Sequence, residues 1–592
     1  MGIPFISWDR AGTLLRCRSI IAASSLVLSV LSFVGCAHVP YGSLPPPTEE
    51  VVVSTLYRPM GSGELPSTTF EVYLQNTTTN AVSFESVALD GLALPEVTSP
   101  EWAKLKEPVK MEGAGMLSPA LASIAWWQFY PLPDVAPGET AVFQIQFAKG
   151  PEKEQKLVIT DSVGKSISVT IPKFQYVQNP KTLRAITYTK DYRRMFVQYQ
   201  SGRPNPVKVW VNNREVAKFS VLKPKEGDGA NMLAFDAPLK IATGKSLHVK
   251  IAFKDNESCE TLVRALSGIM LDAYGADDPS ERKRLGLDEA PAVRLVRSGD
   301  VACADTRTRQ IGSCIPAVIG ERSANVQASA FSNTLTAVQY CVTTSPQLRA
   351  TYGPAVDAAL ASPYSLSLWS DVSRLVEREE LELGLAAESV APRPWLWIPD
   401  VFKRKARFLE PAELDAMAWT ALIQGCKGVR YYQAFDTNGC GFTSCPLLDS
   451  EIVKLNGVIR EREDVLSPLL PVNEETLGNR SKGVRMYTSW VGDRGQLILL
   501  RNLDYRTDDQ GDDNGKDPRF KVTPKQDLKV TFRLPDWLGY RDVRDFETGK
   551  RIKASCDKYR RVHLTVENLD SCAMLWVENK PKRSWLFGWL RG

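Results

Sequence analysis

The sequence contains few of the side chains on which most metal-binding and nucleophilic sites depend. Only three histidines, His38, His248 and His563, occur in 592 residues. No two cysteines have the CxxC spacing that is common in zinc sites. A metal centre and a catalytic centre with a histidine base are therefore not expected. No GxGxxG or GxxxxGK[ST] stretch is present either, so no nucleotide cofactor is expected.

Excess charge of one sign is also lacking. The chain has 73 Lys and Arg against 68 Asp and Glu, a formal net charge of +5, and the two signs are interspersed. Binding to nucleic acid needs a concentrated basic face, so nucleic acid is not an expected partner. The apolar fraction of 43% and the charged fraction of 24% are ordinary for globular proteins. A chain of this length predicts three or four domains.

After residue 36, no segment is apolar over a length that would span a bilayer. Residues 1–36 have an export pattern, in which Arg10, Arg16 and Arg18 precede a largely apolar stretch of 14 residues at 20–33. The pattern ends in FVGC at 33–36, which resembles a bacterial lipobox, with Phe33 where Leu is usual. The resemblance implies that Cys36 is lipidated and becomes the mature N-terminus; a plain signal peptide is the alternative.

Residues 37–50 are proline-rich and predict a tether between an anchor and the folded body. Ala37 is the residue type that the lipoprotein pattern associates with delivery to the outer membrane. The resemblance therefore implies a cell-envelope lipoprotein of a Gram-negative-type bacterium, with the membrane as partner through Cys36.

Two β-sandwiches are expected next, at 51–175 and 176–255. Residues 70–74 alternate between apolar and polar side chains, as a half-buried strand does. The segment APGETAVFQIQF at 136–147 aligns without gaps with ATGKSLHVKIAF at 242–253, each a glycine turn followed by a strand. This match predicts two related, immunoglobulin-like sandwiches.

From residue 256 the pattern changes to apolar runs alternating with helical periodicity, which is typical of βα units and a parallel sheet. A helix is expected from Pro411, since Leu414, Met417 and Leu422 lie on one apolar stripe. The predicted strands are residues 268–271, 292–296, 337–342, 355–360, 395–398 and 429–432.

Three segments of this region carry a more specific resemblance: RPWLW at 393–397, EPAEL at 410–414 and GCKGVRYY at 425–432. Together they resemble the last two strands of a (β/α)8 glycoside-hydrolase barrel. The resemblance implies a TIM barrel over 256–470 and carbohydrate as substrate or ligand. The region has 215 residues, fewer than the ~250 of a typical barrel. A barrel with one or two strands missing or degenerate is therefore the alternative.

Glycosidases carry two carboxylates at the carboxyl ends of barrel strands. No glutamate directly follows a predicted strand, but aspartates do. Asp272 and Asp300 are the candidates for the acid and for the nucleophile or base, and Asp400 and Asp436 are expected to position substrate. The alternative role of each aspartate is to cap a helix or support a βα loop.

Aromatic side chains near the same strand ends fit a carbohydrate ligand, because flat rings stack on the apolar faces of sugars. Tyr364, Trp397 and Tyr432 are the expected substrate contacts. The alternative for these rings is packing in the core.

A C-terminal β-sandwich is expected at 471–580, where the segments 528–532 and 562–566 alternate cleanly. The tail at 581–592 mixes basic and aromatic residues, so it is expected either on an anionic membrane interface or packed on the body. The fold class is thus multidomain, α/β plus all-β.

Three functions are compatible with these patterns. The first is a lipid-anchored glycoside hydrolase that acts on extracytoplasmic polysaccharide. The second is a non-catalytic surface lipoprotein whose decayed barrel binds glycan or a protein partner. The third is a structural envelope protein.

Overall fold

The structure is a computed structural model of the whole chain. Residues 42–592 form one compact unit. The structure describes residues 51–57, 68–95, 110–111, 114–115, 124–131, 133–147, 149–175, 183–199, 205–223, 231–255, 257–289, 293–295, 308–310, 335–341, 349, 353–363, 375–403, 407–435, 438–476, 483–507 and 519–579.

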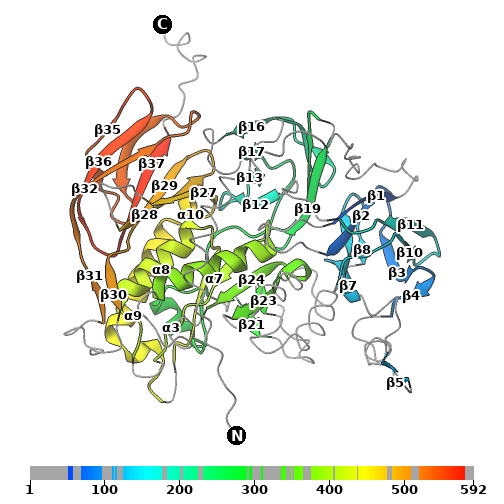
Figure 1. Cartoon of the computed structure of the whole chain (residues 1–592), viewed down its shortest axis with the longest axis horizontal. Coiled ribbons are helices and arrows are strands. Elements are labelled where there is room, and N and C mark those ends of the chain that lie inside the picture. The colour runs from blue at the N-terminus through cyan, green and yellow to red at the C-terminus, as the bar shows by residue number, and fades with distance from the viewer. Residues whose placement is uncertain are drawn as a thin grey trace, which may run out of the picture. The chain divides into compact units, whose positions relative to one another are not determined.

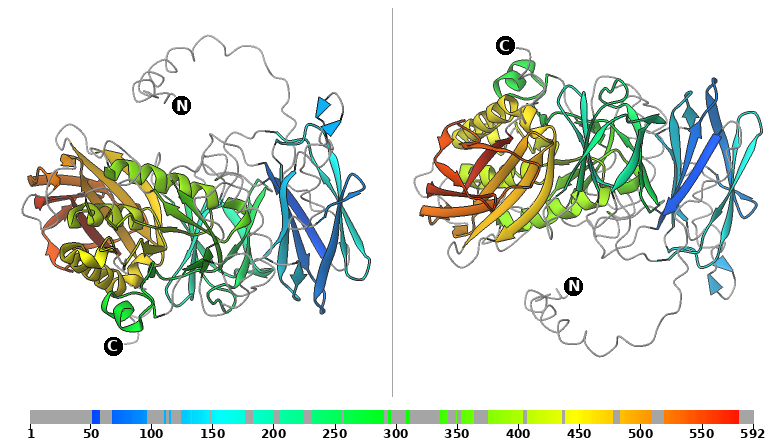
Figure 2. Two further views of the ribbon diagram at one scale, coloured as in Figure 1. Left: turned by 90° about the horizontal axis from the view of Figure 1, so that it is seen from below. Right: turned by 90° about the horizontal axis from the view of Figure 1, so that it is seen from above.

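The first module is a β-sandwich, and Figure 2 shows its strands, in blue and cyan, as two stacked sheets. Both sheets contribute apolar side chains to one core, among them Phe70, Phe143 and Ile159. Trp126 and Trp127 are buried in this core. One sheet has the order β1 (Val51–Tyr57), β2 (Thr69–Asn76), β9 (Thr140–Phe147), β7 (Ile124–Tyr130). The other has the order β11 (Ser166–Ile171), β10 (Gln155–Asp161), β3 (Val82–Leu89), β4 (Leu92–Ala93), with β8 (Asp134–Val135) beside β3. A separate hairpin pairs β5 (Lys110–Met111) with β6 (Ala114–Gly115).

The second module repeats this plan with two four-stranded antiparallel sheets around a core of its own. The first sheet has the order β12 (Leu183–Tyr188), β13 (Arg194–Tyr199), β17 (Asn231–Asp236), β16 (Phe219–Leu222). The second has the order β15 (Arg214–Glu215), β14 (Pro206–Val211), β18 (Ser246–Phe253), β19 (Ser258–Arg264). The immunoglobulin-like topology predicted for both modules stays a prediction.

The central module contains a seven-stranded sheet in which every strand is parallel to its neighbours. Its order is β20 (Met270–Ala273), β26 (Gly428–Tyr431), β25 (Trp395–Trp397), β24 (Ala358–Ser362), β23 (Leu335–Cys341), β22 (Thr308–Gln310), β21 (Val293–Leu295). The first strand thus lies beside the last, as in a barrel. Among the described residues, however, β20 and β21 do not pair, so the sheet is open and the predicted TIM barrel is not confirmed.

Six of the seven strands match predicted ones, and β22 is the strand that the sequence did not predict. The predicted helix is α8 (Pro411–Ile423), which starts with a capping box between Glu410 and Glu413. Helices α7 (Leu375–Val390) and α8 lie along the sheet in Figure 1, and α7 contacts β24 and β25. The other described helices are α3 (Pro279–Arg284), α9 (Pro446–Glu461) and α10 (Glu463–Leu466), with 3-10 turns η1 (Gly353–Ala355) and η2 (Phe442–Ser444).

Alternation along the parallel strands separates the two faces of the sheet. Ala359, Trp397 and Val429 pack in the core that includes the helices. Their neighbours Leu360, Leu396 and Ile398 instead join a smaller core on the other face. We call this second face the inner face. Successive side chains of a strand point to opposite faces of the sheet. Once one residue of a strand is known to lie on the inner face, the faces of its other residues follow.

Gly428 shows how tightly the inner face is packed. A Cβ at this position would lie 2.7 Å from Leu396 Cδ2 and 2.9 Å from the Met270 carbonyl oxygen. Only glycine therefore allows β26 to approach β20 and β25 this closely.

The last module contains two main antiparallel sheets. Its larger sheet has the order β27 (Leu469–Thr476), β28 (Val484–Val491), β29 (Gly495–Asn502), β37 (Cys572–Asn579), β33 (Tyr540–Asp545), β34 (Arg551–Ile552). The outer sheet has the order β32 (Lys525–Arg533), β36 (Arg561–Leu569), β35 (Ala554–Cys556), and β30 (Tyr505–Thr507) pairs with β31 (Phe520–Val522). Helix α8 contacts β28, β29 and β37, so the central module rests on the larger sheet.

Acidic side chains from three elements meet at this junction. Glu547 follows β33, Asp415 lies on α8 and Glu451 on α9, where Lys454 Nζ is 2.8 Å from Glu451 Oε1. Burial raises the pKa of the Glu547 carboxyl to about 7, and the charge of Asp415 adds to the shift. Burial also raises the pKa of Asp415.

Glu547→Gln is expected to change how stability depends on pH. The folded pKa lies above the unfolded value, so Glu547 contributes stability below about pH 4.5, and that contribution is lost as pH rises through about 7. Because the side chain is partly exposed, the expected gain of the variant over the parent at pH 8 is on the order of 1 kcal/mol. Unfolding monitored by circular dichroism at several pH values measures it. Glu567→Gln, an exposed position on β36, is the control. An equal gain at every pH would contradict this assignment.

Candidate functional site

Polar side chains gather on the inner face at the carboxyl end of the parallel sheet. The side-chain alternation that places Met270, Leu360 and Leu396 on the inner face also places later residues of the same strands there. Carboxyl ends of parallel strands meet at one edge, which is where ligands of such sheets bind. The residues assigned to this position are Asp272, Tyr274, Gln339, Ser362, Asp400, Arg430 and Tyr432. We call this group the inner carboxyl edge.

Asp272, the predicted acid or nucleophile, is bound on both oxygens by arginine. Arg282 Nη2 donates to its Oδ1 at 2.9 Å, and Arg430 Nε lies 3.3 Å from its Oδ2. Asp272 and Arg430 are directly paired across β20 and β26. The aspartate is only 1% exposed. Its carboxylate therefore links β20, α3 and β26 through ion pairs inside the protein.

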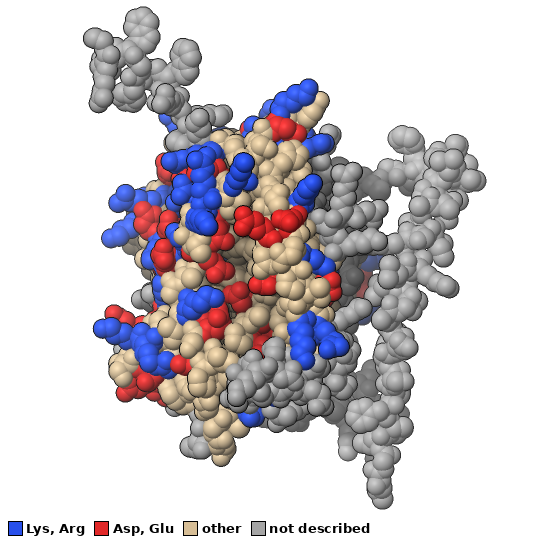
Figure 3. Space-filling view, turned by 90° about the vertical axis from the view of Figure 1, so that its left-hand side faces the viewer, with Lys and Arg blue, Asp and Glu red and all other residues tan. Residues whose placement is uncertain are grey.

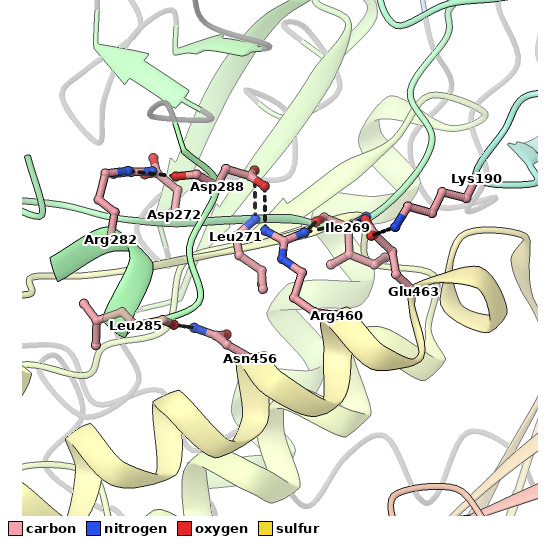
Figure 4. Close-up of polar contacts among 10 residues, drawn as sticks. All are labelled: Lys190, Ile269, Leu271, Asp272, Arg282, Leu285, Asp288, Asn456, Arg460 and Glu463. Carbon is pink, nitrogen blue, oxygen red and sulfur yellow. Dashed lines mark hydrogen bonds and ion pairs between the residues drawn. The ribbon is translucent and has the colours of Figure 1, made fainter. Parts of the chain in front are cut away.

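A second set of polar contacts holds the backbone of β20 and of the residue before it, as Figure 4 shows. Asp288 accepts from the Leu271 amide at 3.3 Å and pairs with Arg460 Nη2 at 2.5 Å. Glu463 accepts from the Ile269 amide at 2.9 Å and pairs with Lys190 of the second sandwich at 2.6 Å. The strand that carries Asp272 is thus held rigidly by charged groups of α9, α10 and the second sandwich.

Three aromatic rings form a row at the inner carboxyl edge. The Tyr432 ring is edge-on to Tyr274 and to Phe402, with centroids 5.0 Å apart in both pairs. Arg430 Cζ lies 3.6 Å from the Tyr274 ring centroid, and the Tyr274 hydroxyl donates to Gln339 Oε1 at 3.3 Å. All three rings are partly exposed. The row is therefore both ordered by neighbours and accessible to a ligand.

Asp400 lies next to this row. It follows β25 and forms an isolated parallel bridge with Tyr432, whose amide donates to the Pro399 carbonyl at 3.3 Å. The side chain of Asp400 is 4% exposed. Asp400 and Tyr432 were both predicted as substrate-binding residues, and the structure brings them together.

The remaining predicted residues are placed differently. Trp397 is fully buried on the helix-covered face, where its Nε1 donates to Glu379 Oε1 at 2.6 Å, so it does not face the inner carboxyl edge. Asp300, Asp436, Tyr364 and Cys36 lie outside the described residues.

Arg430, Gln339 and Ser362 were not predicted as site residues. Ser362 Oγ is buried and has no hydrogen-bond partner among the described residues. The sequence did contain a signal for their position. Each of these residues lies an even number of positions from an apolar residue of the inner face, and such residues point to the same side of a strand. The described part of the chain contains no cluster of His, Cys, Asp or Glu that would hold a metal ion.

A cavity of about 490 Å³ lies at the opposite end of the sheet. Trp395 at the start of β25 and Lys427 just before β26 line it, together with residues of both neighbouring sandwiches. Burial lowers the pKa of Lys427 to about 7. Its Nζ donates to the carbonyls of Leu466, Ser467 and Leu469 at 3.4, 2.7 and 3.4 Å. This lysine therefore ties the central module to the chain entering the last sandwich.

Comparisons with known proteins do not assign the chain to a family. No protein-family model and no curated protein matches it. Among solved structures, a glycoside hydrolase is similar at 12% identity and a TM-score of 0.27, covering 46% of this chain and 65% of its own length. A glycoside hydrolase family 5 protein from Bacteroides vulgatus is similar at 12% identity and a TM-score of 0.28, over 47% and 62%.

A third similar structure is SGBP-B of the Bacteroides ovatus mixed-linkage glucan utilization locus, solved with a mixed-linkage heptasaccharide, at 9% identity and a TM-score of 0.15. It covers 35% of this chain and 43% of its own length. This chain thus spans less than two thirds of each of these three structures. With TM-scores this low, the similarities carry no argument about function.

Proposed function

We propose that the inner carboxyl edge binds carbohydrate, in a cell-envelope protein anchored through a lipid on Cys36. The observation that carries the proposal is the row of Tyr274, Tyr432 and Phe402, three partly exposed rings, with Asp400 bridged to Tyr432 through the backbone. Aromatic rings stack on the apolar faces of sugars, and carboxylates and amides accept or donate hydrogen bonds to hydroxyl groups. Tyr432 is the expected stacking platform and Asp400 the expected hydrogen-bond acceptor.

The contacts of Asp272 favour binding over hydrolysis. A catalytic carboxyl group must reach the scissile bond and exchange a proton or form a covalent bond with the sugar. Asp272 is buried, and both its oxygens are engaged by Arg282 and Arg430. These contacts fit a structural carboxylate at the base of a binding surface.

Hydrolysis is the second candidate function, and the position of Asp400 favours it. Asp400 follows β25 at the carboxyl edge, where barrel glycosidases carry catalytic carboxylates. A partner carboxylate at about 5 Å would give retention, and one at roughly 6.5–9.5 Å inversion. Asp300 is the residue proposed for that partner.

A panel of polysaccharides tests both candidates with one protein preparation. We expect retardation of the parent in affinity gels containing the recognised polysaccharide, without release of reducing sugar. Tyr432→Ala is expected to weaken the affinity about tenfold, since stacking on one ring contributes on the order of 1 kcal/mol or more.

Leu92→Ala, at an exposed apolar side chain of the first sandwich, is the control and is expected to bind as the parent does. Release of reducing sugar that Asp400→Asn abolishes would establish hydrolysis instead. Equal retardation of the parent and Tyr432→Ala would contradict the proposed site.

A further inference from the structure

Cationic side chains gather at one end of the outer sheet of the C-terminal sandwich. Arg533 ends β32 and Arg561 begins β36, and the two are directly opposite each other. Both are exposed. Like charges directly opposite on neighbouring strands destabilise a sheet. The pairing therefore adds no charge complementarity to the sheet, and both exposed cations are available to an anionic partner.

The turn between β35 and β36 adds to this charge. Tyr559 at its tip is 56% exposed, with Lys558 Nζ 5.0 Å and Arg561 Cζ 5.8 Å from its ring centroid. The turn is well formed, because Asp557 accepts from the amides of Tyr559 and Arg561 at 2.9 and 2.8 Å. We call Arg533, Lys558, Tyr559, Arg560 and Arg561 the basic end.

Two acidic groups lie close to the basic end. The Asp557 carboxylate is used inside the turn, and His563 Nε2 lies 3.4 Å from it. Asp536 is 3.8 Å from Arg560 Nε and its side chain is 79% exposed. Neither has an ion pair with Arg533 or Arg561 among the described residues. In Figure 3, Lys and Arg lie toward the top of the face shown and also near its lower edge, while Asp and Glu lie across its middle.

The last described residue, Asn579, also lies close to the basic end. The Arg560 guanidinium donates to the carbonyl of Pro535 at 2.8 Å and to that of Leu538. The next residue, Gly539, donates its amide to Oδ1 of Asn579, the last described residue, at 2.7 Å. Residues 580–592 therefore start beside the basic end. They contain four cationic residues, no acidic one, and Trp585, Phe587 and Trp589.

We propose that the basic end is a docking surface for anionic lipid headgroups. Cations near an anionic membrane are each worth about a fivefold gain in partitioning. Exposed aromatic rings next to cations suit the membrane interface, where a ring is partly apolar and the charges reach phosphates. An acidic polysaccharide would also attract the cations. The tryptophans, leucines and phenylalanine that follow Asn579 favour the membrane, because they offer apolar area to the acyl boundary.

This docking surface is independent of the carbohydrate site and would give the chain a second membrane contact besides the one proposed at Cys36. Two weak membrane signals together give stable attachment where one alone is reversible. The outer sheet of the last sandwich would then lie toward the membrane.

Vesicle binding tests the proposal. Residues 42–592 form a compact unit. A protein of these residues lacks Cys36, so a lipid anchor makes no contribution to its binding to vesicles. We expect sedimentation with phosphatidylcholine vesicles that contain phosphatidylglycerol, no binding to pure phosphatidylcholine, and loss of binding at high salt. The double variant Arg533→Gln/Arg561→Gln is expected to partition at least about tenfold more weakly.

The double variant Arg214→Gln/Lys218→Gln is the control, since it removes the same charge from exposed positions of the second sandwich. It is expected to bind as the parent does. The thermal midpoint of the Arg533→Gln/Arg561→Gln variant is expected to be no lower than that of the parent, because a repulsive pair is removed. Lost binding is therefore separable from lost folding.

Three results would overturn the proposal. The first is equal vesicle binding by the parent and the Arg533→Gln/Arg561→Gln variant. The second is complete loss of binding in a chain that ends at Asn579, which would assign all of it to the tail. The third is binding of the parent to polygalacturonate that excess phosphatidylglycerol vesicles do not displace and that the double variant loses, which would assign the surface to acidic polysaccharide.

Discussion

Glu380→Ala is expected to lower the free energy of unfolding by about 3–5 kcal/mol, because it removes the acidic partner of two arginines at once. Glu380 lies on α7 and is 8% exposed. Arg485 Nη1 lies 2.9 Å from its Oε2 and Arg501 Nη2 2.5 Å from the same oxygen, and the Tyr487 hydroxyl also donates to the carboxylate. Arg501 is 1% exposed, so its charge has no access to water once the glutamate is gone.

Differential scanning calorimetry measures this effect. The loss corresponds to a fall of the melting midpoint on the order of 10 °C for a module of this size. Leu381→Ala, at the neighbouring position of the same helix, is the control because Leu381 is 64% exposed. Its midpoint is expected to stay within about 2 °C of the parent's. A Glu380→Ala variant that melts with the parent would show that α7 does not hold the central module to the last sandwich.

Asp272→Asn distinguishes a structural aspartate from a catalytic one. Substitution leaves Arg282 and Arg430 buried with no carboxylate between them, and removal of one partner of a buried pair typically costs about 3–5 kcal/mol. The asparagine oxygen retains one acceptor, so we expect the lower part of that range. Calorimetry with a parallel hydrolysis assay gives both readouts.

Asp277→Asn, at an exposed aspartate of the loop that follows β20, is the control and is expected to match the parent. A destabilised Asp272→Asn variant that still binds polysaccharide after refolding would support the structural role. Unchanged stability together with abolished hydrolysis would show that Asp272 is catalytic.

The strands of the central sheet were predictable because each is a short apolar run between turns. Met270, Leu360 and Leu396 are buried in fully parallel strands, and such strands read as continuous hydrophobic segments. Helix α8 was predictable for a similar reason, from its proline start and apolar residues. Strand β22 escaped prediction, since Thr308–Gln310 is short and polar.

The site was harder to predict because its contacts depend on registers between strands far apart in the sequence. Nothing local to Asp272 indicates that Arg430 lies opposite it. Helix α7 has the same difficulty, since its glutamates suggest an exposed surface. Glu379 and Glu380 are instead buried against Trp397 and against arginines of the last sandwich. Aromatic residues at strand ends point to different sides of the sheet: Tyr432 packs against the inner-face core, whereas Trp397 is buried against α7.

Hydrogen–deuterium exchange with and without a recognised polysaccharide tests the central claim most directly. If the inner carboxyl edge binds the sugar, amides in residues 398–403 and 431–435 exchange more slowly in its presence, and those of the two N-terminal sandwiches are unchanged. Protection confined to the sandwiches, with no change in these two segments, would contradict a binding site on the parallel sheet.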